Sequence, residues 1–460
     1  MKRLVATACL GLAVAGLCAR LSSAAFTGST SIPSNSVTVD KLANYFSVTP
    51  LNGTVASGGV DTLALDFGTV ASARTFNSVF RVTNVSGASR TAVLTLSNVP
   101  QISTVAFSGG GTSVTLAAGA STTVDVTTSS TVAGRGSGTL RLALSGIGWM
   151  YRDYSVKIDE APEAPTVPAV AQKPAGRLDL SWTASTTTTN LAGYDVYRSN
   201  GGAYTKLNSA PLTGTSYSDT STADGTTYTY KLNAVSSGLP LLTSVDSSTV
   251  TATADATPPG APTTVSLVNG GGAGNAYVNA GNASSISVSI SPPANSLTTD
   301  TVKLTVSNGG NSVTTTQAGT NGPGTITISG VNVAGIGDGT VTISASSTDA
   351  AGNVGNATSI AVTKDTVAPG APSASYTDNN NATADVVSGS AEANASITVT
   401  RSSPTATYST TANGSGAYSI NVAATAGKPN GPIAVTYTVT AADAAGNTSA
   451  ATPLNVSDTK

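Results

Sequence analysis

The chain has 460 residues, which is too long for one small β domain and, at ordinary domain sizes, predicts three or four domains. Only 10% of the residues are charged and 5% are aromatic, so a helical bundle is excluded and short β-strands separated by Gly, Asn and Asp turns are favoured. The 21 basic and 23 acidic residues form no basic stripe, which excludes nucleic acid as an expected partner.

The first 25 residues have the order of a secretory signal. Two basic residues precede an apolar run from Leu4 to Ala19, and small residues follow up to Ala25. This order predicts a signal peptide over residues 1–25, with cleavage after Ala25. The alternative is a lipoprotein signal with Cys18 as the lipid-bearing residue, but Leu17 stands where such signals need a small residue.

Cleavage would leave a chain without cysteine, because Cys9 and Cys18 both lie in the predicted signal. Export without disulfides is more typical of bacterial surface proteins than of small disulfide-rich domains. No other apolar run approaches the roughly 20 residues that span a bilayer. The C-terminal "LNVSDTK" has neither a hydrophobic tail nor a Leu-Pro-x-Thr-Gly sorting motif. We therefore expect a secreted, extracellular or cell-surface bacterial protein with no transmembrane segment after cleavage.

Regular alternation of apolar and polar residues predicts folded strands rather than disorder. It is seen in "SISVSI" (285–290), "GTITISG" (324–330) and "VTYTVTA" (435–441). Proline-rich stretches interrupt this patterning and favour extended connections. They are "DEAPEAPTVPAV" (159–170), "DATPPGAP" (255–262) and "DTVAPGAP" (365–372). The sequence therefore predicts an all-β chain of four β-sandwiches, at residues 26–160, 161–254, 255–365 and 366–460.

The first segment contains a series of strands separated by Gly breaks. Asp66-Phe67-Gly68 precedes the strand and turn "FRVTNVSG", and "LAAGASTTVDV" follows later. This pattern resembles bacterial Ig-like domains related to the ASPM/SPD-2/Hydin group. The stretch "AAFTGSTSIPSNSVTV" (24–39) also resembles the start of some exported bacterial filament and matrix proteins.

Aromatic residues mark the second segment, residues 161–254. "GRLDLSWTAS" places Trp182 on the expected second strand, "LAGYDVYRSN" places Tyr194 on the third, and "DGTTYTYKLNA" carries Tyr228 and Tyr230. These features resemble a fibronectin type III domain. The resemblance implies that the rings pack between the sheets and that the Tyr228 hydroxyl bonds the backbone as a tyrosine corner. Ligand binding by these aromatics is the alternative.

The last two segments repeat a pattern. "SASSTDAAGNVGNATSIAVTKDT" aligns with "VTAADAAGNTSAATPLNVSDTK", and "ITVTRSSPTATYSTTANGSGAYSINV" is typical of the middle of bacterial adhesin modules. Both segments resemble tandem bacterial Ig-like domains. The predicted fold class is therefore a tandem array of Ig-like and fibronectin type III β-sandwiches.

The inventory of reactive residues argues against an enzyme. The whole chain contains no His, and the predicted mature chain contains no Cys. That excludes Ser-His-Asp and Cys-His catalysis and thiolate or histidine metal sites. A pair of carboxylates of the glycosidase type remains chemically open, but the acids are scattered and no cluster lies beside aromatic residues.

The repeated Asp-Ala-Ala-Gly-Asn motif allows two interpretations. The first is a hairpin turn in which Asp caps its own backbone and Gly352 or Gly446 supplies a positive φ. The second is a calcium site, because Ca²⁺ takes carboxylate, amide and carbonyl oxygens. The resemblance to calcium-rigidified adhesin repeats also implies calcium at the domain joints.

Sandwich topology determines which joint each motif would serve. The eleven residues 354–364 would cover roughly 36 Å as a strand, so the turn at 349–353 cannot meet Asp365. It should lie at the joint where its own domain begins, near Asp255, and the turn at 443–447 should lie near Asp365. The predicted calcium ligands are Asp255, Asp349, Asn353, Asp365, Asp443 and Asn447.

These observations predict a non-catalytic spacer and adhesion or matrix-interaction module whose partner is an extracellular protein or glycan. One alternative is an accessory protein of extracellular polysaccharide degradation, for which Trp149, Tyr151 and Tyr154 would form a sugar platform. Packing in a core or interface is the other interpretation of these three rings. A further alternative is a fibre subunit, since exposed Thr- and Val-rich edge strands permit self-association.

Overall fold

A computed structural model describes residues 30–32, 35–37, 40–322, 324–379, 384–423 and 432–459. The regular structure in these ranges is β-strand apart from three 3-10 turns: η1 (Leu42–Asn44), η2 (Pro174–Gly176) and η3 (Ala273–Asn275). The predicted signal peptide, residues 1–25, lies outside the described residues. No helix in the described ranges has the length and apolar character needed to cross a membrane. The fold is a series of tandem β-sandwiches, as predicted.

The chain divides into two compact units. One comprises the residues up to Gln172 together with Arg177–Ala254, and the other comprises Lys173–Gly176 together with Asp255–Lys460. Each unit holds two hydrophobic cores, and each core lies between two sheets. We number the four sandwiches in chain order.

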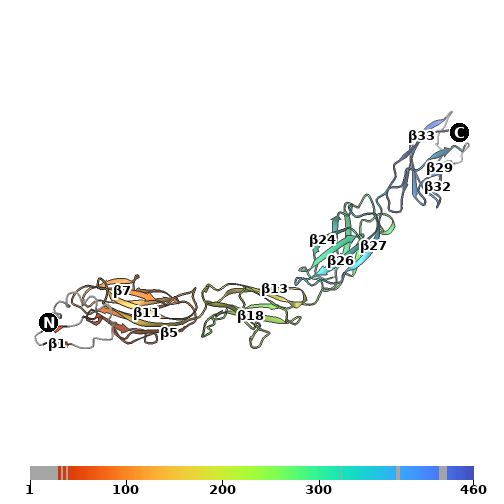
Figure 1. The fold of residues 1–460 in the computed structure, drawn as a ribbon. Helices are drawn as coiled ribbons and strands as arrows, with labels where there is room; N and C mark the ends of the chain where they lie inside the picture. The colour runs from red at the N-terminus through yellow and green to blue at the C-terminus, as the bar shows by residue number, and fades with distance from the viewer. Residues whose placement is uncertain are drawn as a thin grey trace. The chain divides into compact units, whose positions relative to one another are not determined.

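The first sandwich has a four-stranded and a six-stranded sheet (Figure 1). The first sheet has the order β3 (Phe46–Pro50), β6 (Thr75–Asn84), β10 (Ser121–Thr128), β8 (Ile102–Phe107). The second has the order β4 (Ala56–Ser57), β5 (Ala64–Val70), β12 (Tyr151–Glu160), β11 (Gly134–Leu144), β7 (Arg90–Ser97), β9 (Ser113–Leu116). A separate hairpin, β1 (Thr30–Ile32) and β2 (Asn35–Val37), precedes them. Strand β12 buries every second residue from Tyr154 to Glu160, as a strand between a core and solvent does.

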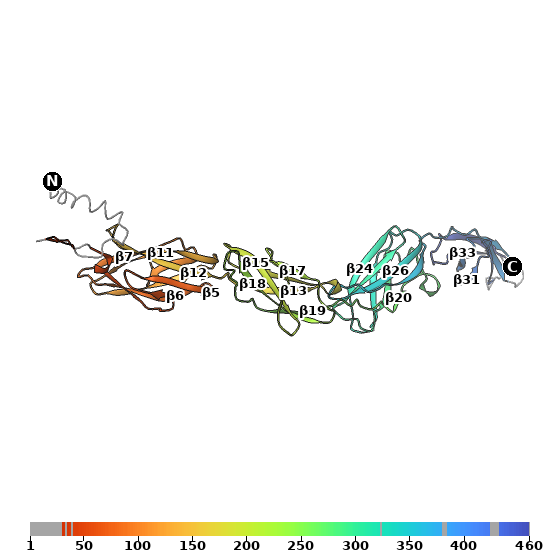
Figure 2. The same cartoon turned by 60° about the horizontal axis from the view of Figure 1, so that its bottom comes forward.

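The second sandwich has a three-stranded and a four-stranded sheet (Figure 2). One sheet is β13 (Thr166–Gln172), β14 (Leu178–Thr183), β17 (Ser216–Asp219); the other is β16 (Thr205–Lys206), β15 (Leu191–Ser199), β18 (Thr227–Ser236), β19 (Val250–Thr253). Trp182 and Tyr194 pack edge to face with ring centroids 5.6 Å apart. The Tyr228 hydroxyl accepts the backbone N–H of Ala223 at 2.9 Å, the bond expected of a tyrosine corner.

The third and fourth sandwiches have equivalent strand orders, except that the third has an additional edge strand, β21, in its second sheet, which is written here from the opposite edge to that of the fourth. In the third, β20 (Thr264–Leu267), β22 (Ile286–Ser291), β25 (Ile326–Val331) face β21 (Tyr277–Val278), β27 (Thr358–Lys364), β26 (Gly339–Thr348), β23 (Thr301–Ser307), β24 (Ser312–Ala318). In the fourth, β28 (Ser375–Thr377), β29 (Asp385–Ser390), β32 (Ala417–Val422) face β31 (Thr405–Thr411), β30 (Ser396–Ser402), β33 (Ile433–Ala442), β34 (Thr452–Asp458). The Asp-Ala-Ala-Gly-Asn motif begins the connection between the last two strands of each.

Candidate functional site

The Asp-Ala-Ala-Gly-Asn turns close on themselves through their first and last residues. In the turn after β26, Asp349 Oδ1 accepts the backbone N–H of Asn353, and Asp349 Oδ2 accepts its side-chain amide, both at 2.8 Å. Gly352 has φ +92°, which a residue with a Cβ rarely adopts. The turn after β33 repeats the bonds between Asp443 and Asn447 at 2.8 Å each. The turn chemistry predicted from the sequence is therefore present in both.

Asn447 also reaches out of its own turn. Its Nδ2 donates to the carbonyl of Asp365 at 2.9 Å, and its Oδ1 accepts the backbone N–H of Ala280 at 2.9 Å. In return, Asn279 Nδ2 donates to the carbonyl of Ala445 at 2.8 Å. Asn279 and Ala280 follow strand β21 of the third sandwich, whereas Asn447 belongs to the fourth. The turn thus bonds one sandwich to the sandwich before it, with Asn447 only 5% exposed.

Asn353 makes the equivalent contacts within the same unit. Its Nδ2 donates to the carbonyl of Asp255 at 3.0 Å, and its Oδ1 accepts the backbone N–H of Ala175 at 2.8 Å. The backbone N–H of Gly176 donates to the same Asp255 carbonyl at 3.1 Å. In both cases a buried Asn amide satisfies one backbone donor and one backbone acceptor.

The predicted proximity of each turn to its own joint is found, at Asp255 for the first turn and at Asp365 for the second. The joint carboxylates bond locally: Asp255 Oδ1 accepts Thr257 N–H and Asp365 Oδ1 accepts Val367 N–H, each at 3.1 Å. The Asn oxygens expected as calcium ligands accept backbone N–H groups instead. Calcium at these residues therefore remains a prediction.

The segments whose backbone N–H groups donate to Asn353 and Asn447 were not identified from the sequence. They are Ala175-Gly176 and Ala280-Gly281, so a shared Ala-Gly dipeptide was the available signal. Ala175 has φ +60°, in the left-handed region that most residues avoid. A two-residue match in a chain rich in Ala and Gly is too common to predict a contact.

A group of three carboxylates lies in the fourth sandwich. Among the described residues, Asp378, Asp385 and Asp458 form the group of acids that could hold a metal ion, with one oxygen from each within 4.8 Å of the others. Asp385 and Asp458 are both 1% exposed. Asp385 accepts the Tyr376 hydroxyl at 2.7 Å, and Asp378 accepts the backbone N–H of Thr459 at 2.7 Å. Burial, with the bond to Asp385, raises the pKa of Tyr376.

A different set of bonds joins the first and second sandwiches. Thr188 N–H donates to the carbonyl of Thr131 at 3.0 Å, and Ala133 N–H donates to the carbonyl of Thr189 at 3.1 Å. Asn190 Nδ2 donates to the carbonyl of Ala133 at 2.9 Å. This joint has no Asp-Ala-Ala-Gly-Asn turn, and its hydrogen bonds come from backbone groups of two loops together with the side chain of Asn190.

The connection between the first two sandwiches begins at a buried acid. Glu160, the last residue of β12, is 0% exposed, and its Oε1 accepts the Thr128 hydroxyl at 3.3 Å. Its Oε2 has no hydrogen-bond partner in the described part of the chain. Burial raises the pKa of Glu160 to about 8, despite the hydrogen bond from Thr128, and the negative charge of Glu163 adds to the rise. Glu160 is therefore mainly protonated at neutral pH.

The three aromatic residues of the possible sugar platform do not share one face. Tyr154 is 1% exposed and its hydroxyl donates to the carbonyl of Val60 at 2.9 Å. Tyr151 lies under the guanidinium of Arg141, with 3.7 Å between the guanidinium carbon and the ring centroid. Trp149 is 41% exposed. Tyr154 thus has the predicted core role, and Trp149 alone of the three presents a largely open ring.

Known proteins resemble parts of this chain. Residues 368–458 match the family described as Bacterial Ig domain. An amylopullulanase of Thermoanaerobacterium saccharolyticum is 34% identical over 119 residues, which is 25% of this chain and 9% of that protein. Chitinase 63 of Streptomyces plicatus is 36% identical over 84 residues, which is 18% of this chain and 13% of the chitinase. The chain thus spans a small part of the curated relatives that it matches.

Solved structures of tandem β domains are also similar. The chicken CNTN1 FN1–FN3 domains are 11% identical, with 65% of this chain and 99% of that chain covered and a TM-score of 0.28. A tetra-tandem repeat from the extending region of a large adhesion protein is 19% identical, with 90% and 99% covered and a TM-score of 0.24. The family match thus covers the fourth sandwich, and the described residues as a whole form tandem β-sandwiches.

Proposed function

We propose that this protein is a non-catalytic modular protein of the bacterial surface or extracellular space, acting as a spacer and an adhesion or matrix-interaction module. The observation that carries the proposal is the repeated Asn clamp, in which Asn353 and Asn447 each bond backbone groups outside their own turn. A spacer needs joints that resist bending, and buried, fully bonded amides supply local resistance.

The inventory of reactive groups supports a non-catalytic role. The chain has no His, and its two Cys residues are at positions 9 and 18, within the predicted signal peptide. Glu160, a buried acid with a raised pKa, lies at a joint, bonded to Thr128, and not in an open cleft.

Cell fractionation tests the proposed location and adhesion assays test the role. We expect the chain in the culture fluid or accessible to a membrane-impermeant biotin reagent on intact cells. Cells that lack it should adhere less to surfaces coated with extracellular matrix from the same culture, and expression of the intact chain should restore adhesion. Retention of the chain in the cytoplasm, or unchanged adhesion without it, would contradict the proposal.

A second candidate function is an accessory role in extracellular polysaccharide degradation. It is favoured by the similarity of part of the chain to an amylopullulanase and to a chitinase. Co-sedimentation with insoluble starch and chitin tests it, because a carbohydrate-binding protein would move to the pellet. Binding should be lost in Trp149→Ala and kept in Tyr204→Ala, a matched exposed aromatic of the second sandwich. Absence of the chain from both pellets would reject this role.

A further inference from the structure

Strand β24 (Ser312–Ala318) lies at an edge of the five-stranded sheet of the third sandwich. It pairs with β23 on one side, and its other side has no partner strand in the described part of the chain. The pairing with β23 is regular over all seven residues, without a bulge. Five of the seven are exposed, and Val313 and Thr315 are half-buried. The edge is therefore regular and accessible, which the proposed spacer function does not explain.

Other edge strands in the described ranges carry features that discourage strand addition. Pro50 and Pro453 lie in β3 and β34, and the registers of β8, β13 and β25 are irregular. In the fourth sandwich, Ala423 N–H donates to the Tyr408 hydroxyl at 3.1 Å, which ties β31 to the end of β32. Within the described residues, β24 has none of these features. The remaining edge strands have only two to four residues, namely β1, β2, β4, β9, β16, β17, β19, β20, β21 and β28.

The sequence of β24 makes its edge complementary to itself. An edge strand presents N–H and C=O groups in alternation, so a second strand of the same sequence, laid antiparallel, meets each donor with an acceptor. A two-fold axis makes this contact identical for both copies. The residues of β24, "SVTTTQA", include no charge and no proline, so two copies neither repel each other nor lose a hydrogen-bond donor.

We propose that β24 pairs with β24 of a second copy of this chain, antiparallel about a two-fold axis at Thr315. An axis at Thr314 would leave Gln317 and Ala318 unpaired, so the axis at Thr315 is the one that uses the whole strand. Threonines paired across strands stabilise a sheet, and the Thr305 and Thr314 hydroxyls are already 3.5 Å apart between β23 and β24. The proposed pairs between copies are Thr315 with Thr315, Thr314 with Thr316, Val313 with Gln317, and Ser312 with Ala318.

The pairing sets the direction of the two copies. Strands of the third sandwich run between its two joints, since the turn before β27 contacts Asp255 and β27 ends directly before Asp365. Antiparallel β24 strands therefore place the two copies in opposite directions. Copies that extend from two facing surfaces meet in this way. The inference rests on the proposed adhesion function and deepens it, because the partner in adhesion would be a second copy.

Sedimentation velocity of the predicted mature chain, residues 26–460, over a range of concentrations tests the proposal. We expect a monomer at low concentration and a dimer at high concentration. Thr314→Lys with Thr316→Lys should weaken the dimer at least about tenfold, because lysines of the two copies would then face each other. Thr407→Lys with Ser409→Lys is the matched control, since these exposed residues have the same spacing on β31, and it should leave the dimer unchanged.

Two mixing experiments distinguish contact from misfolding. The lysine variant mixed with Thr314→Glu/Thr316→Glu should recover a dimer, because opposite charges then face each other. A Thr314→Cys chain should form a disulfide with a Thr316→Cys chain, and neither should cross-link with itself, because like positions are offset by about 7 Å of strand.

A dimer that the lysines leave intact, or one that the β31 control weakens equally, would overturn the proposal. A chain that is monomeric at every concentration would also overturn it and would leave a foreign strand as the occupant of the edge. Cross-linking of Thr314→Cys with itself as readily as with Thr316→Cys would contradict the register. Because purified protein is used, a dimer in solution together with unchanged adhesion of cells would contradict the proposed function alone.

Discussion

At the scale of single residues, Glu160 is a carboxyl group whose ionisation the fold opposes. It is fully buried at the end of β12, with one carboxyl oxygen bonded to Thr128 and the other unbonded within the described residues. A buried carboxylate without a partner is costly, whereas a neutral carboxyl is tolerated. Ionisation of Glu160, next to the joint of the first two sandwiches, therefore destabilises the fold.

The pH dependence of stability tests this account of Glu160. Its pKa is about 8 in the fold and 4.5 ordinarily, so the unfolded chain releases the proton first. The free energy of unfolding should therefore fall between about pH 4.5 and pH 8, by at most about 1.4 kcal/mol per pH unit. Glu160→Gln should abolish this slope. Urea unfolding followed by Trp149 fluorescence in a Trp182→Phe background measures it, because the chain has only two Trp residues.

Glu392→Gln is the matched control, since Glu392 is exposed and lies in the fourth sandwich. It should leave the slope of the first sandwich unchanged. A Glu160→Gln variant that keeps the full slope would show that another group is responsible.

At the scale of elements, close approach of strands limits where side chains fit. A Cβ on Gly389 of β29 would lie 1.9 Å from the carbonyl oxygen of Ser373 and 2.8 Å from the Tyr418 hydroxyl. Gly389→Ala should therefore destabilise the fourth sandwich by roughly 1–3 kcal/mol. Gly414→Ala should be nearly neutral, because nothing lies within 4 Å of its Cβ position. Thermal unfolding of the two variants compares them, and equal melting temperatures would contradict the packing.

Calcium at the two turns is also an element-scale prediction. Bound Ca²⁺ would raise the melting temperature of the third and fourth sandwiches relative to chelator, and Asp443→Ala would reduce that rise. Calorimetry of the full chain with Ca²⁺ and with chelator measures the effect. An identical melting profile in both conditions would reject calcium, and the hydrogen-bonded turn would then be the complete structure.

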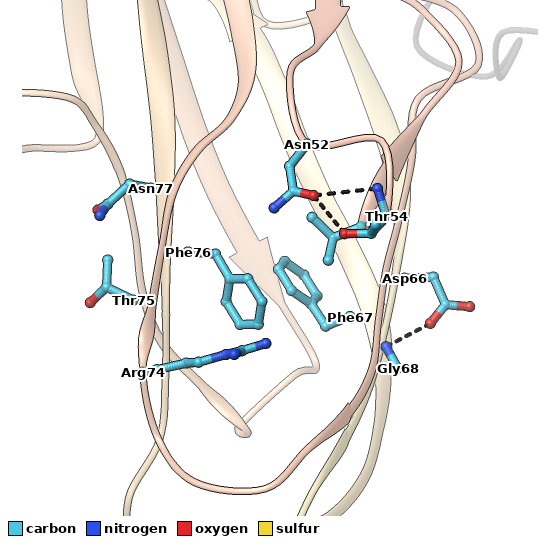
Figure 3. Close-up of a pocket in the computed structure, with 10 residues that line it drawn as sticks. Asn52, Thr54, Asp66, Phe67, Gly68, Arg74, Thr75, Phe76 and Asn77 are labelled. Carbon is cyan, nitrogen blue, oxygen red and sulfur yellow. Dashed lines mark hydrogen bonds between the residues drawn. The ribbon is translucent and has the colours of Figure 1, made fainter.

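The elements also show what sequence patterns can and cannot predict. Strands such as β22 and β33 follow directly from alternating apolar residues, because that alternation is a local property of the chain. The turns at 349–353 and 443–447 contact Asp255 and Asp365, as predicted, because strand length separates the two ends of a sandwich. The contact of Asn447 with Ala280 was not predictable, because it depends on how a loop 167 residues away is placed. A depression of the first sandwich, lined among others by Phe67 of β5 and Phe76 of β6, was likewise not predictable, because these two strands lie in different sheets (Figure 3).

At the scale of the whole molecule, hydrogen bonds are found at the joints within each of the two units. In the second unit a buried Asn amide bonds the backbone at two places, with Asn353 and Asn447 in equivalent positions. In the first unit the backbone groups of two loops and the side chain of Asn190 make the joint. A chain with few large side chains thus obtains its joints from hydrogen bonds of the backbone and of Asn.

The most direct test of this claim is the distribution of distances between spin labels on the third and fourth sandwiches. Labels on Thr314→Cys and Ser409→Cys are suitable, because both sites are exposed and the predicted mature chain has no other cysteine. The account predicts one narrow distribution that broadens in Asn447→Ala and stays narrow in Asn455→Ala, an exposed asparagine of β34. A distribution in the unchanged chain as broad as that of Asn447→Ala would contradict it.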